Sequence, residues 1–446
     1  MELSRAVLHI GMDDIDSWLG GCTTHFAYEV LRELIARFNV KLLDYPALIR
    51  LNPNVPWKTR GNGAVCLRVE VKSNIIDEVV RFLGLKLRSY TSNFHDSDPV
   101  IALIEGNVDK ALIDFYRKAL MEVVTLKEAI DLAHKVGAIV IKPRSGMGLI
   151  GSLAAIGSLT LNDYTFEILA YRHVNQPRRL DHYSVWTMEF ETWPYTFNNV
   201  DYEDGRVLIT PHGPDPVFYG IRGEESDVVI KAAQLIRTYE EPLGKMVFRT
   251  NQGTDCHYMK IDSLEKVKLY MSIAFRGEVA SKPIVIKGGH VIFKVSRGAH
   301  EIWCAAYKPS GDIRRVAEKL NIGDEVEVYG GVKGLPGSDI ASLNLEKIVV
   351  VRAQKKIVEK NPPCPNCHRT LKSSGRYGMK CEFCGFKMLK KEKVQIEVHR
   401  DDIEGMYLPP PRSMRHLAKP FRRYGMEKKE YMFRENAVDL SKVMIL

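Results

Sequence analysis

The chain has 446 residues, of which 45% are hydrophobic, and a formal net charge of +9. This length predicts three or four domains with apolar cores. No run of about 18 apolar residues is present, and no signal-peptide pattern opens the chain, which argues against membrane or secreted proteins. Four of the eight cysteines are scattered, so no disulfide framework is indicated and we expect a cytoplasmic protein.

The first region opens with an apolar strand at Ala6–Ile10, followed at once by the acids Asp13, Asp14 and Asp16. Open α/β sheets place ligands at the carboxyl ends of their strands, and crowded carboxylates repel one another without a cation. Oxygen ligands suit Mg²⁺, which commonly arrives with nucleotide phosphates. An acidic turn before a helix cap is the simpler alternative. The next residues suit an anion pocket at a helix start: Gly20, Gly21, Thr23 and Thr24.

A stiff basic segment at 52–64 precedes an alternating strand that begins near Val65. Lys58 offers a point charge and Arg60 can bind a phosphate in bidentate fashion, while Gly61 and Gly63 permit close backbone approach. A basic hairpin turn is the alternative, because Asn-Gly is a common turn pair. Together with the acids, the segment favours metal–nucleotide chemistry.

Further elements follow from hydrophobic spacing. The first region is predicted to hold helices at 26–38, 75–83 and 110–120, and at 97–104 a turn that leads into a strand. A second region begins near Ala138, with a small-residue stretch at 142–157 that permits close packing or phosphate approach. It continues with strands at 161–170 and 185–190, a rigid loop at 211–223 and a helix at 227–239.

A third, β-rich region has five strand candidates and one helix, which together suggest an oligonucleotide-binding (OB) barrel. The strands are 272–279, 290–295, 302–307, 325–329 and 343–350, and the helix at 312–320 lies between the third and fourth. Four aromatic residues are candidates for base stacking, although most aromatics at strand spacing belong to a core: Phe275, Phe293, Trp303 and Tyr307.

The last region contains the pattern Cys-x2-Cys-x13-Cys-x2-Cys. Two matched CxxC pairs are typical of a zinc ribbon, in which four thiolates close a tetrahedral structural site, and a redox CxxC is the weaker alternative. The predicted zinc ligands are Cys364, Cys367, Cys381 and Cys384.

Residues 361–446 carry 18 Lys and Arg against 10 Asp and Glu, so nearly all the positive excess lies beside the cysteines. A basic, zinc-bearing end favours nucleic-acid binding over a merely solvated tail. The candidate RNA-binding residues are Arg412, Arg415, His416, Lys419, Arg422 and Arg423.

In their order, these segments resemble the archaeal tRNA-isoleucine agmatidine synthetase family over essentially the whole chain. The resemblance is carried by 11–17, 22–24, 58–64, 148–151, 196–201, 211–217, 250–255, the barrel-like block, the four cysteines and 415–417. It implies a multidomain α+β fold: a kinase-like α/β domain (1–137), a ferredoxin-like domain (138–266), an OB-fold barrel (267–353), and a zinc ribbon with a basic tail (354–446).

The resemblance also implies a reaction, the ATP-dependent attachment of agmatine to C-2 of the wobble cytidine of the isoleucine tRNA with the CAU anticodon. ATP is consumed to AMP and phosphates, and Thr23 matches a threonine that becomes phosphorylated. The chemistry is reasonable because phosphorylation turns the base oxygen into a leaving group that a primary amine can displace. Asp13, Asp14 and Asp16 would hold Mg²⁺, and Lys58 and Arg60 would offset developing charge.

Other roles follow from the same resemblance. ATP would contact Gly20, Gly21, Thr24, Thr59, Gly61, Asn62 and Gly63. The guanidinium of agmatine is expected to pair with a carboxylate. Asp215 is the first candidate for this carboxylate, and Asp201 and Asp163 are weaker ones. Two other classes stay open. A non-catalytic OB and ribbon protein that binds single strands would leave the acids idle, and a kinase with an appended nucleic-acid domain would ignore agmatine.

Overall fold

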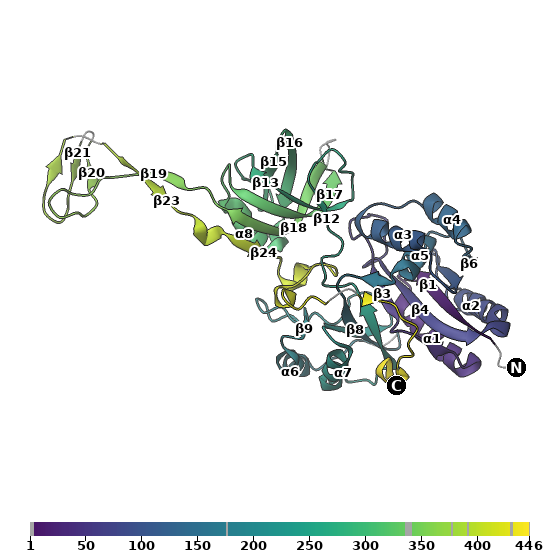
Figure 1. Ribbon diagram of the computed structural model, residues 1–446. Helices are drawn as coiled ribbons and strands as arrows, with labels where there is room; N and C mark the ends of the chain where they lie inside the picture. Colours follow the sequence, from purple (N-terminus) through teal and green to yellow (C-terminus); the bar gives the residue numbers. More distant parts are fainter. Residues whose placement is uncertain are drawn as a thin grey trace.

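The computed structural model describes residues 4–174, 177–334, 341–375, 378–389, 392–428 and 431–445. Figure 1 shows a large unit of helices and sheet, a barrel above it, and a small ribbon at the end of a two-stranded arm. Within the described residues, no helix has the length and apolar character needed to cross a membrane.

The large unit is built on one mixed sheet of eleven strands in the described chain. From one edge to the other its path runs β6 (Ile139–Ile141), β5 (Val100–Glu105), β1 (Arg5–Asp13), β4 (Gly63–Lys72), β3 (Ala47–Arg50), β11 (Gly244–Thr250), β8 (Thr165–Tyr171), β10 (Val217–Gly223) and β9 (Thr196–Phe197). Off this path, β2 (Lys41–Leu42) pairs with β4, and β26 (Met444–Ile445) pairs with β11.

Helices cover both faces of the first half of this sheet. Leu8, Ile10 and Met12 of β1 pack in one core with α1 (Thr23–Phe38) and α2 (Ile76–Tyr90). The other face meets α3 (Lys110–Met121), α4 (Leu126–Lys135) and α5 (Leu149–Gly157). Here α5 comes very close to β1, because a Cβ added at Gly11 would lie 2.1 Å from the Ser152 carbonyl oxygen. The small-residue stretch therefore permits close packing.

The strand directions correct one premise of the sequence analysis. β1 is antiparallel to both β4 and β5, so the acids do not lie at the edge of a parallel sheet. Among the described pairings of this sheet, β3 with β11 is the parallel one. The acids still follow the end of β1, so their placement rests on that strand and not on the parallel-sheet rule.

A second correction concerns residues 185–190, which the sequence predicted as a strand. They belong to α6 (His182–Thr192), whose Asp181 cap accepts a hydrogen bond from the Tyr183 backbone N–H. Its aromatic and β-branched residues suggested a strand, but Val185 and Met188 lie three residues apart and share one buried helical face. This face and α7 (Ser226–Leu235) cover the second half of the sheet.

The β3–β11 pairing joins the first and second regions into one continuous sheet. The expected boundary near residue 138 falls inside the packing of the first half, because β6 pairs with β5 and α5 packs against β1. The division at 137/138 stays a prediction.

The third region forms a closed barrel of five strands, as the sequence predicted. In chain order these are β13 (Ser272–Val279), β15 (His290–Arg297), β16 (His300–Ala306), β17 (Glu325–Gly334) and β18 (Ala341–Arg352), with α8 (Asp312–Lys319) between β16 and β17. Two short strands extend the sheet at its edges, β12 (Met259–Ile261) and β14 (Ile284–Ile286). Phe275 and Phe293 lie in the barrel core, so they are not available for base stacking.

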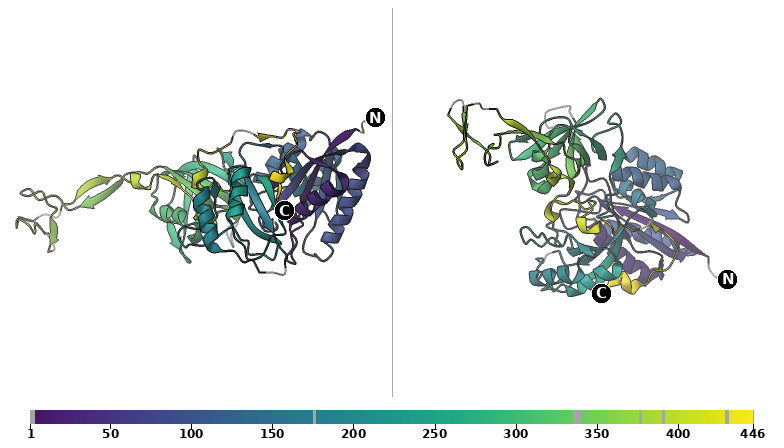
Figure 2. Two further views of the ribbon diagram at one scale, coloured as in Figure 1. Left: turned by 90° about the horizontal axis from the view of Figure 1, so that it is seen from below. Right: turned by 60° about the vertical axis from the view of Figure 1, so that its left-hand side comes forward.

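The arm consists of β19 (Lys356–Lys360) paired with β23 (Val394–Val398), and it holds the ribbon away from the rest of the molecule (Figure 2). The ribbon has β20 (Lys372–Ser374), β21 (Gly378–Lys380) and β22 (Lys387–Met388). The chain then returns to the large unit. β24 (Gly405–Tyr407) pairs with β18, and β25 (Tyr431–Met432) pairs with β7 (Thr160–Leu161), before β26 joins β11. The residues expected as a basic tail therefore pack against the barrel and the large unit, and we call the segment from β24 to β26 (405–445) the strap.

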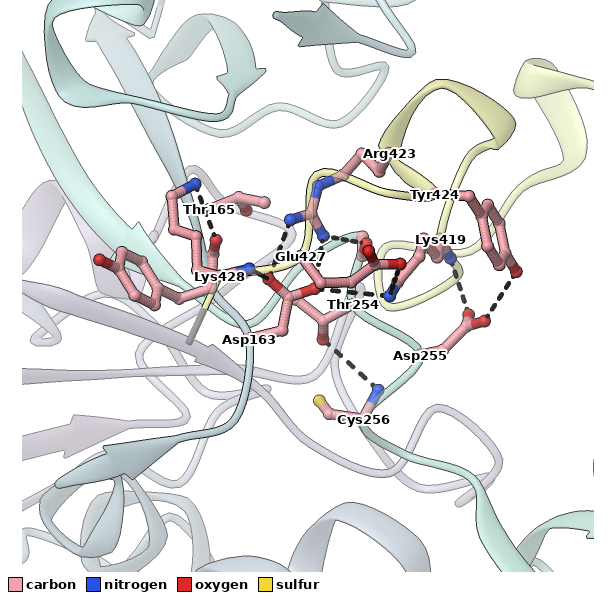
Figure 3. A network of polar contacts seen from close by, with 12 residues as sticks. Asp163, Thr165, Thr254, Asp255, Cys256, Lys419, Arg423, Tyr424, Glu427 and Lys428 are labelled. Carbon is pink, nitrogen blue, oxygen red and sulfur yellow. Dashed lines mark hydrogen bonds and ion pairs between the residues drawn. The ribbon is translucent and has the colours of Figure 1, made fainter. Parts of the chain in front are cut away.

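Arg423 anchors this strap, and Figure 3 shows the surrounding network. Its side chain is completely buried. The guanidinium donates two 3.0 Å hydrogen bonds to Asp163 and others to Glu224 at 2.5 and 3.2 Å. Lys428 also pairs with Glu224, at 3.2 Å. Arg423 therefore neutralises two carboxylates of the second region from the far end of the chain.

Replacing Arg423 by alanine should destabilise the protein by about 3–5 kcal/mol, because two buried carboxylates lose the guanidinium that they share. Among the ion pairs of the described residues, each then keeps only a lysine partner, Lys419 at 3.6 Å from Asp163 and Lys428 at 3.2 Å from Glu224. Denaturant unfolding at neutral pH measures this loss. The exposed Arg434 lies on the same strap, and its change to alanine is the control. A cost below about 1 kcal/mol, the range of an exposed ion pair, would show that the network is not an anchor.

Candidate functional site

The acids lie where β1 leaves the sheet. Asp14 has a left-handed backbone with φ of 56°, which turns the chain so that Asp13 and Asp16 point to different sides. The Asp14 carboxylate accepts a 3.1 Å hydrogen bond from the backbone N–H of Asp98. This turn is held between the end of β1 and the segment before β5.

Several cavities adjoin the basic loop 57–63, and three of them hold most of the predicted site residues. Cavity A, about 290 Å³, is lined by Asp16, Cys22, Thr23, Thr24, Arg50, Arg60, Gly61, Gly63, Glu167, Asp215, Arg222 and His416, among others. Cavity B, about 90 Å³, includes Asp13, Asp14, Lys58, Thr59, Asn62 and Gly151. Cavity C, about 630 Å³, includes Trp18, Arg50, Lys58, Arg60, Gly61, His212, Asp215, Arg415 and His416. The predicted acidic and basic segments therefore come together, with the acids divided between two cavities.

Asp13 and Asp14 form an electrostatically strained pair in cavity B. Burial, reinforced by the charge of Asp14, raises the pKa of Asp13 well above its usual value. Burial also raises the pKa of Asp14 to about 6, although the Asp98 N–H opposes the shift. Their charged forms lack a cation partner among the ion pairs of the described residues. A divalent cation would relieve this cost.

On the cavity A side, Arg60 connects the two regions. Its guanidinium lies 3.4 Å from Asp16 and 3.0 Å from Asp215. It also donates hydrogen bonds to the carbonyl oxygens of Ser17 at 2.7 Å and Gly21 at 3.1 Å. Arg60 thus holds the acidic loop of the first region against the 211–217 loop of the second.

Thr23 begins helix α1 and is almost fully buried. Its hydroxyl accepts a 3.3 Å hydrogen bond from the Ile15 backbone N–H and donates to Asp16 at 3.4 Å. Thr24 also lines cavity A, whereas Gly20 and Gly21 line none of the three cavities and shape the turn before α1. Gly20 needs its glycine because its φ is 110°.

The three candidate carboxylates for agmatine lie apart. Asp215 lines cavities A and C and pairs with both Arg60 and Arg178. Asp163 is held by Arg423, and Asp201 is held by Arg412 at 2.9 Å. Neither Asp163 nor Asp201 lines cavity A, B or C.

Most of the residues expected to bind RNA have carboxylate partners within the protein. The pairs are Arg412 with Asp201 and Glu203, Arg415 with Glu346, Lys419 with Glu427, and Arg422 with Glu189. For Arg423 the expectation is corrected, since a completely buried side chain cannot contact a polynucleotide. RNA contacts by the other five candidates, His416 included, stay a prediction.

His416 lies in a different setting from the one expected. It lines cavities A and C, and burial together with Arg50 and Arg222 lowers its pKa well below the usual value. The neutral ring cannot offer a charge to a phosphate, so it would act as a hydrogen-bonding group. The segment after the ribbon therefore contributes directly to the cavity walls.

Sequence reasoning missed several charged residues on the wall of cavity A. Glu167 is buried in β8 and pairs with Arg222 of β10 at 3.0 Å. Gln252, from a loop whose role was unclear, bridges Glu167 at 2.5 Å and Arg50 at 3.3 Å. An acidic residue inside the apolar run 165–171 was the one signal available, and it did not identify its partners.

The ribbon is the clearest metal site. In the described part of the chain, the four cysteines form the one group whose ligand atoms all lie within 4.8 Å of one another. The sulfurs of Cys364 and Cys384 are 3.4 Å apart, as are those of Cys367 and Cys381. Thiolates about 2.3 Å from a tetrahedral zinc ion lie roughly 3.8 Å apart. The cluster therefore fits structural Zn²⁺.

Gly151 gives a steric test of the acidic site. A Cβ at this position in α5 would lie 1.8 Å from an Asp13 carboxylate oxygen. Gly151→Ala should therefore displace Asp13. The rate of the expected ATP-dependent reaction should fall by about 10- to 100-fold, the scale expected when a reacting group moves by about 1 Å. Gly84→Ala in helix α2 is the control, since its nearest contact would be 3.7 Å away. Unchanged steady-state turnover in Gly151→Ala would remove Asp13 from the site.

With this geometry established, comparison with known proteins is informative. Models of three TiaS domains match the chain, the TCKD domain over 9–90, the FLD domain over 146–257 and the C-terminal zinc ribbon over 361–401. The isoleucine-tRNA 2-agmatinylcytidine synthetase TiaS of Staphylothermus marinus is 41% identical over 96% of both chains. The same enzyme of Pyrococcus horikoshii is 40% identical over 93% of this chain and 96% of its own.

Solved structures agree with the sequence relatives. A crystal structure of TiaS with its isoleucine tRNA and ATP superposes with a TM-score of 0.82 at 35% identity, covering 96% of this chain and all of that one. A complex of TiaS with the same tRNA, AMPCPP and agmatine gives 0.80 at 33% identity, with the same coverage. The chain belongs to the TiaS family of isoleucine-tRNA 2-agmatinylcytidine synthetases.

Proposed function

We propose that this protein joins agmatine to C-2 of the wobble cytidine of the CAU-anticodon isoleucine tRNA, consuming ATP and forming agmatidine. One observation carries the proposal. In a chain aligned with named agmatidine synthetases over nearly its full length, Arg60 ties the acidic strand end of the first region to Asp215 of the second around one cavity. The residues proposed for phosphoryl transfer therefore lie next to the residue proposed for amine binding.

Mg²⁺ belongs to the proposal through Asp13 and Asp14. Magnesium is commonly held by one or two carboxylates together with substrate phosphates, and both acids line cavity B with raised pKa values. When bound, the ion would neutralise phosphate oxygens. Asp16 is not part of a three-carboxylate cluster by distance, and we assign it to the positioning of Arg60 and Thr23.

The remaining residues suit the steps of base activation. Lys58 lines cavities B and C, and it shares cavity B with Asp13, so it can approach phosphate oxygens bound there. Thr23, at the N-terminus of α1, would accept or pass on a phosphoryl group where backbone N–H groups favour an anion. Phosphorylation of the cytosine O2 makes it a leaving group. The neutral amine of agmatine then forms the new bond at C-2, the C–O bond breaks as phosphate departs, and the departing phosphate takes up the proton that the amine loses.

For agmatine we retain Asp215, because it lines cavity A. Asp163 and Asp201 line none of the three cavities, and this sets them apart from Asp215, since all three carboxylates have arginine partners. Glu167, on another wall of the same cavity, is a second acidic group within the amine-binding space. Asp215→Asn should raise the KM for agmatine more than that for ATP.

The finer domain assignments are part of the same proposal. We assign residues 1–137 to a kinase-like domain, 138–266 to a ferredoxin-like domain, and 267–353 to an OB-fold that grips the tRNA with the ribbon and strap of 354–446. The helix between the third and fourth barrel strands supports the OB assignment. A cytoplasmic location would place the protein with its tRNA and ATP.

Purified protein, the cognate transcript, ATP and labelled agmatine provide the test. Label should enter the tRNA only when all four are present, and a transcript with uridine at the wobble position should remain unlabelled. Binding of tRNA without incorporation would favour the non-catalytic OB and ribbon alternative. ATP turnover that ignores both tRNA and agmatine would favour a kinase.

The pKa of Asp14 sets an expected pH dependence. Since it lies at about 6, the Asp14 carboxylate loses its charge as pH falls through that value, and divalent-cation binding should weaken. The Mg²⁺ concentration that half-saturates nucleotide binding should rise by up to about tenfold per pH unit below 6. Fluorescent-nucleotide titrations between about pH 5 and 8 measure this. A requirement for Mg²⁺ that stays flat across this range would contradict the assignment.

A further inference from the structure

The turn before helix α1 exposes a tryptophan beside cavity C. The ring of Trp18 is 72% exposed, and the residue lines the cavity wall. A single exposed aromatic residue has little meaning by itself. Trp18 differs because its backbone is fixed by hydrogen bonds and because cationic side chains line the same cavity.

The turn that carries Trp18 is fixed from two sides. The Asp96 carboxylate accepts hydrogen bonds from the Ser17 hydroxyl at 2.6 Å and from the Trp18 backbone N–H at 2.8 Å. Arg60 donates to the Ser17 carbonyl oxygen at 2.7 Å. Because the backbone of this turn is already fixed, only the side-chain torsions of Trp18 lose freedom when the ring binds a ligand.

Cavity C has the charge expected of a site for a polyanion. Its walls hold four cationic side chains, Arg50, Lys58, Arg60 and Arg415, against the single carboxylate of Asp215. Within the described chain Lys58 forms no ion pair with a carboxylate, and it lies where cavities B and C adjoin, so its ammonium can face a phosphate in either one. An aromatic face beside cationic side chains is the combination that binds single-stranded nucleic acid, through base stacking and phosphate contacts.

The position of the cavity favours RNA over free nucleotide. Arg415 on its wall lies 3.2 Å from Glu346 of barrel strand β18, so cavity C is next to the barrel. The acids proposed to receive the ATP phosphates, Asp13 and Asp14, line cavity B and not cavity C. An RNA loop gripped by the barrel would therefore reach cavity C.

We propose that cavity C is a nucleotide-binding subsite for the anticodon loop and that Trp18 stacks on one of its bases. This inference rests on the proposed function, because it takes the RNA to be the tRNA substrate. A base stacked on Trp18 would hold the loop in place while the neighbouring wobble cytidine is turned out of its stack into the reaction space.

Substitution of Trp18 tests the subsite. Trp18→Ala should weaken tRNA affinity, and raise its KM, by about 5- to 150-fold, the range of alanine substitutions at stacking residues. Trp18→Tyr should recover most of the affinity, and the KM values for ATP and agmatine should stay unchanged. Tyr183→Ala is the control, because that ring is 74% exposed and lines none of the three cavities.

Fluorescence supplies a readout that a structural role would not affect. The difference between wild type and Trp18→Tyr isolates the Trp18 emission among five tryptophans. Adding tRNA without ATP or agmatine should quench this emission, and Mg²⁺–ATP alone should not.

The outcomes separate this inference from the proposed function. An active wild type whose Trp18→Ala variant matches Tyr183→Ala in tRNA affinity would overturn the stacking proposal alone. Quenching by ATP alone, with a raised KM for ATP, would overturn it in favour of adenine binding. A wild type without agmatine incorporation would refute the proposed function, while tRNA-dependent quenching would still support an RNA subsite.

Discussion

Asp14→Asn should lower ATP-dependent agmatine incorporation by roughly 100- to 1000-fold, the scale of losing one electrostatic partner of a transition state. The fold should survive, because asparagine tolerates a φ of 56° and its amide oxygen can still accept the Asp98 hydrogen bond. tRNA affinity should be retained, since cavity B is not among the surfaces proposed for RNA. Incorporation and tRNA binding are measured on the same preparation.

The same substitution has a second, opposite effect on stability. Without metal at about pH 7.5, Asp14→Asn should stabilise the protein by about 1–3 kcal/mol, because it removes a carboxylate whose pKa is raised to about 6. Added Mg²⁺–nucleotide should then raise the melting temperature of wild type more than that of the variant. Asp77→Asn, at an exposed position in α2, controls for the charge change. Activity above a tenth of wild type would remove Asp14 from the metal-binding pair.

Cys364→Ser should release the ribbon zinc and leave less than about 0.1 zinc per chain, because a structural site loses its closed tetrahedron with one ligand. The ribbon should unfold, while the large unit stays folded because the arm holds the ribbon apart from it (Figure 2). tRNA affinity should fall on the order of tenfold or more, about 1.4 kcal/mol per factor of ten. Zinc analysis and tRNA titration measure the two effects.

Cys256→Ser is the matched control for this experiment. It removes one thiol outside the cluster, so thiol content falls equally while zinc should remain bound. Full zinc occupancy in Cys364→Ser would mean that the Cys364 thiolate is not a zinc ligand. Zinc loss with unchanged tRNA affinity would leave the ribbon without its proposed RNA role.

Local patterns were sufficient wherever the contacts are close in sequence. Strand β13 begins and ends at the predicted residues 272 and 279, because its alternating side chains fill the barrel core. The four cysteines form their cluster from two tight turns. Residues 185–190 misled because their content of aromatic and β-branched residues outweighed the helical spacing of Val185 and Met188.

The strap shows why charge composition alone was misleading. The basic residues near the end of the chain suggested a free surface for RNA, but Arg412, Arg422 and Arg423 have carboxylate partners more than 190 residues earlier. The sequence gives the number of charged residues but does not show which residues lie next to them in the folded protein. Ion pairing over such separations depends on how the chain returns from the ribbon to the large unit.

By itself, the sequence determined most of the helices and strands, the barrel, the zinc ligands and the two segments that meet at the site, because these depend on spacing along the chain. Only the tertiary structure decided that the acids divide between two cavities and that His416 enters the walls of cavity A. It also decided that Asp163 and Asp201 already have arginine partners. The physical reason is that electrostatic partners are chosen by distance in space, which the folded sheet and the returning strap establish.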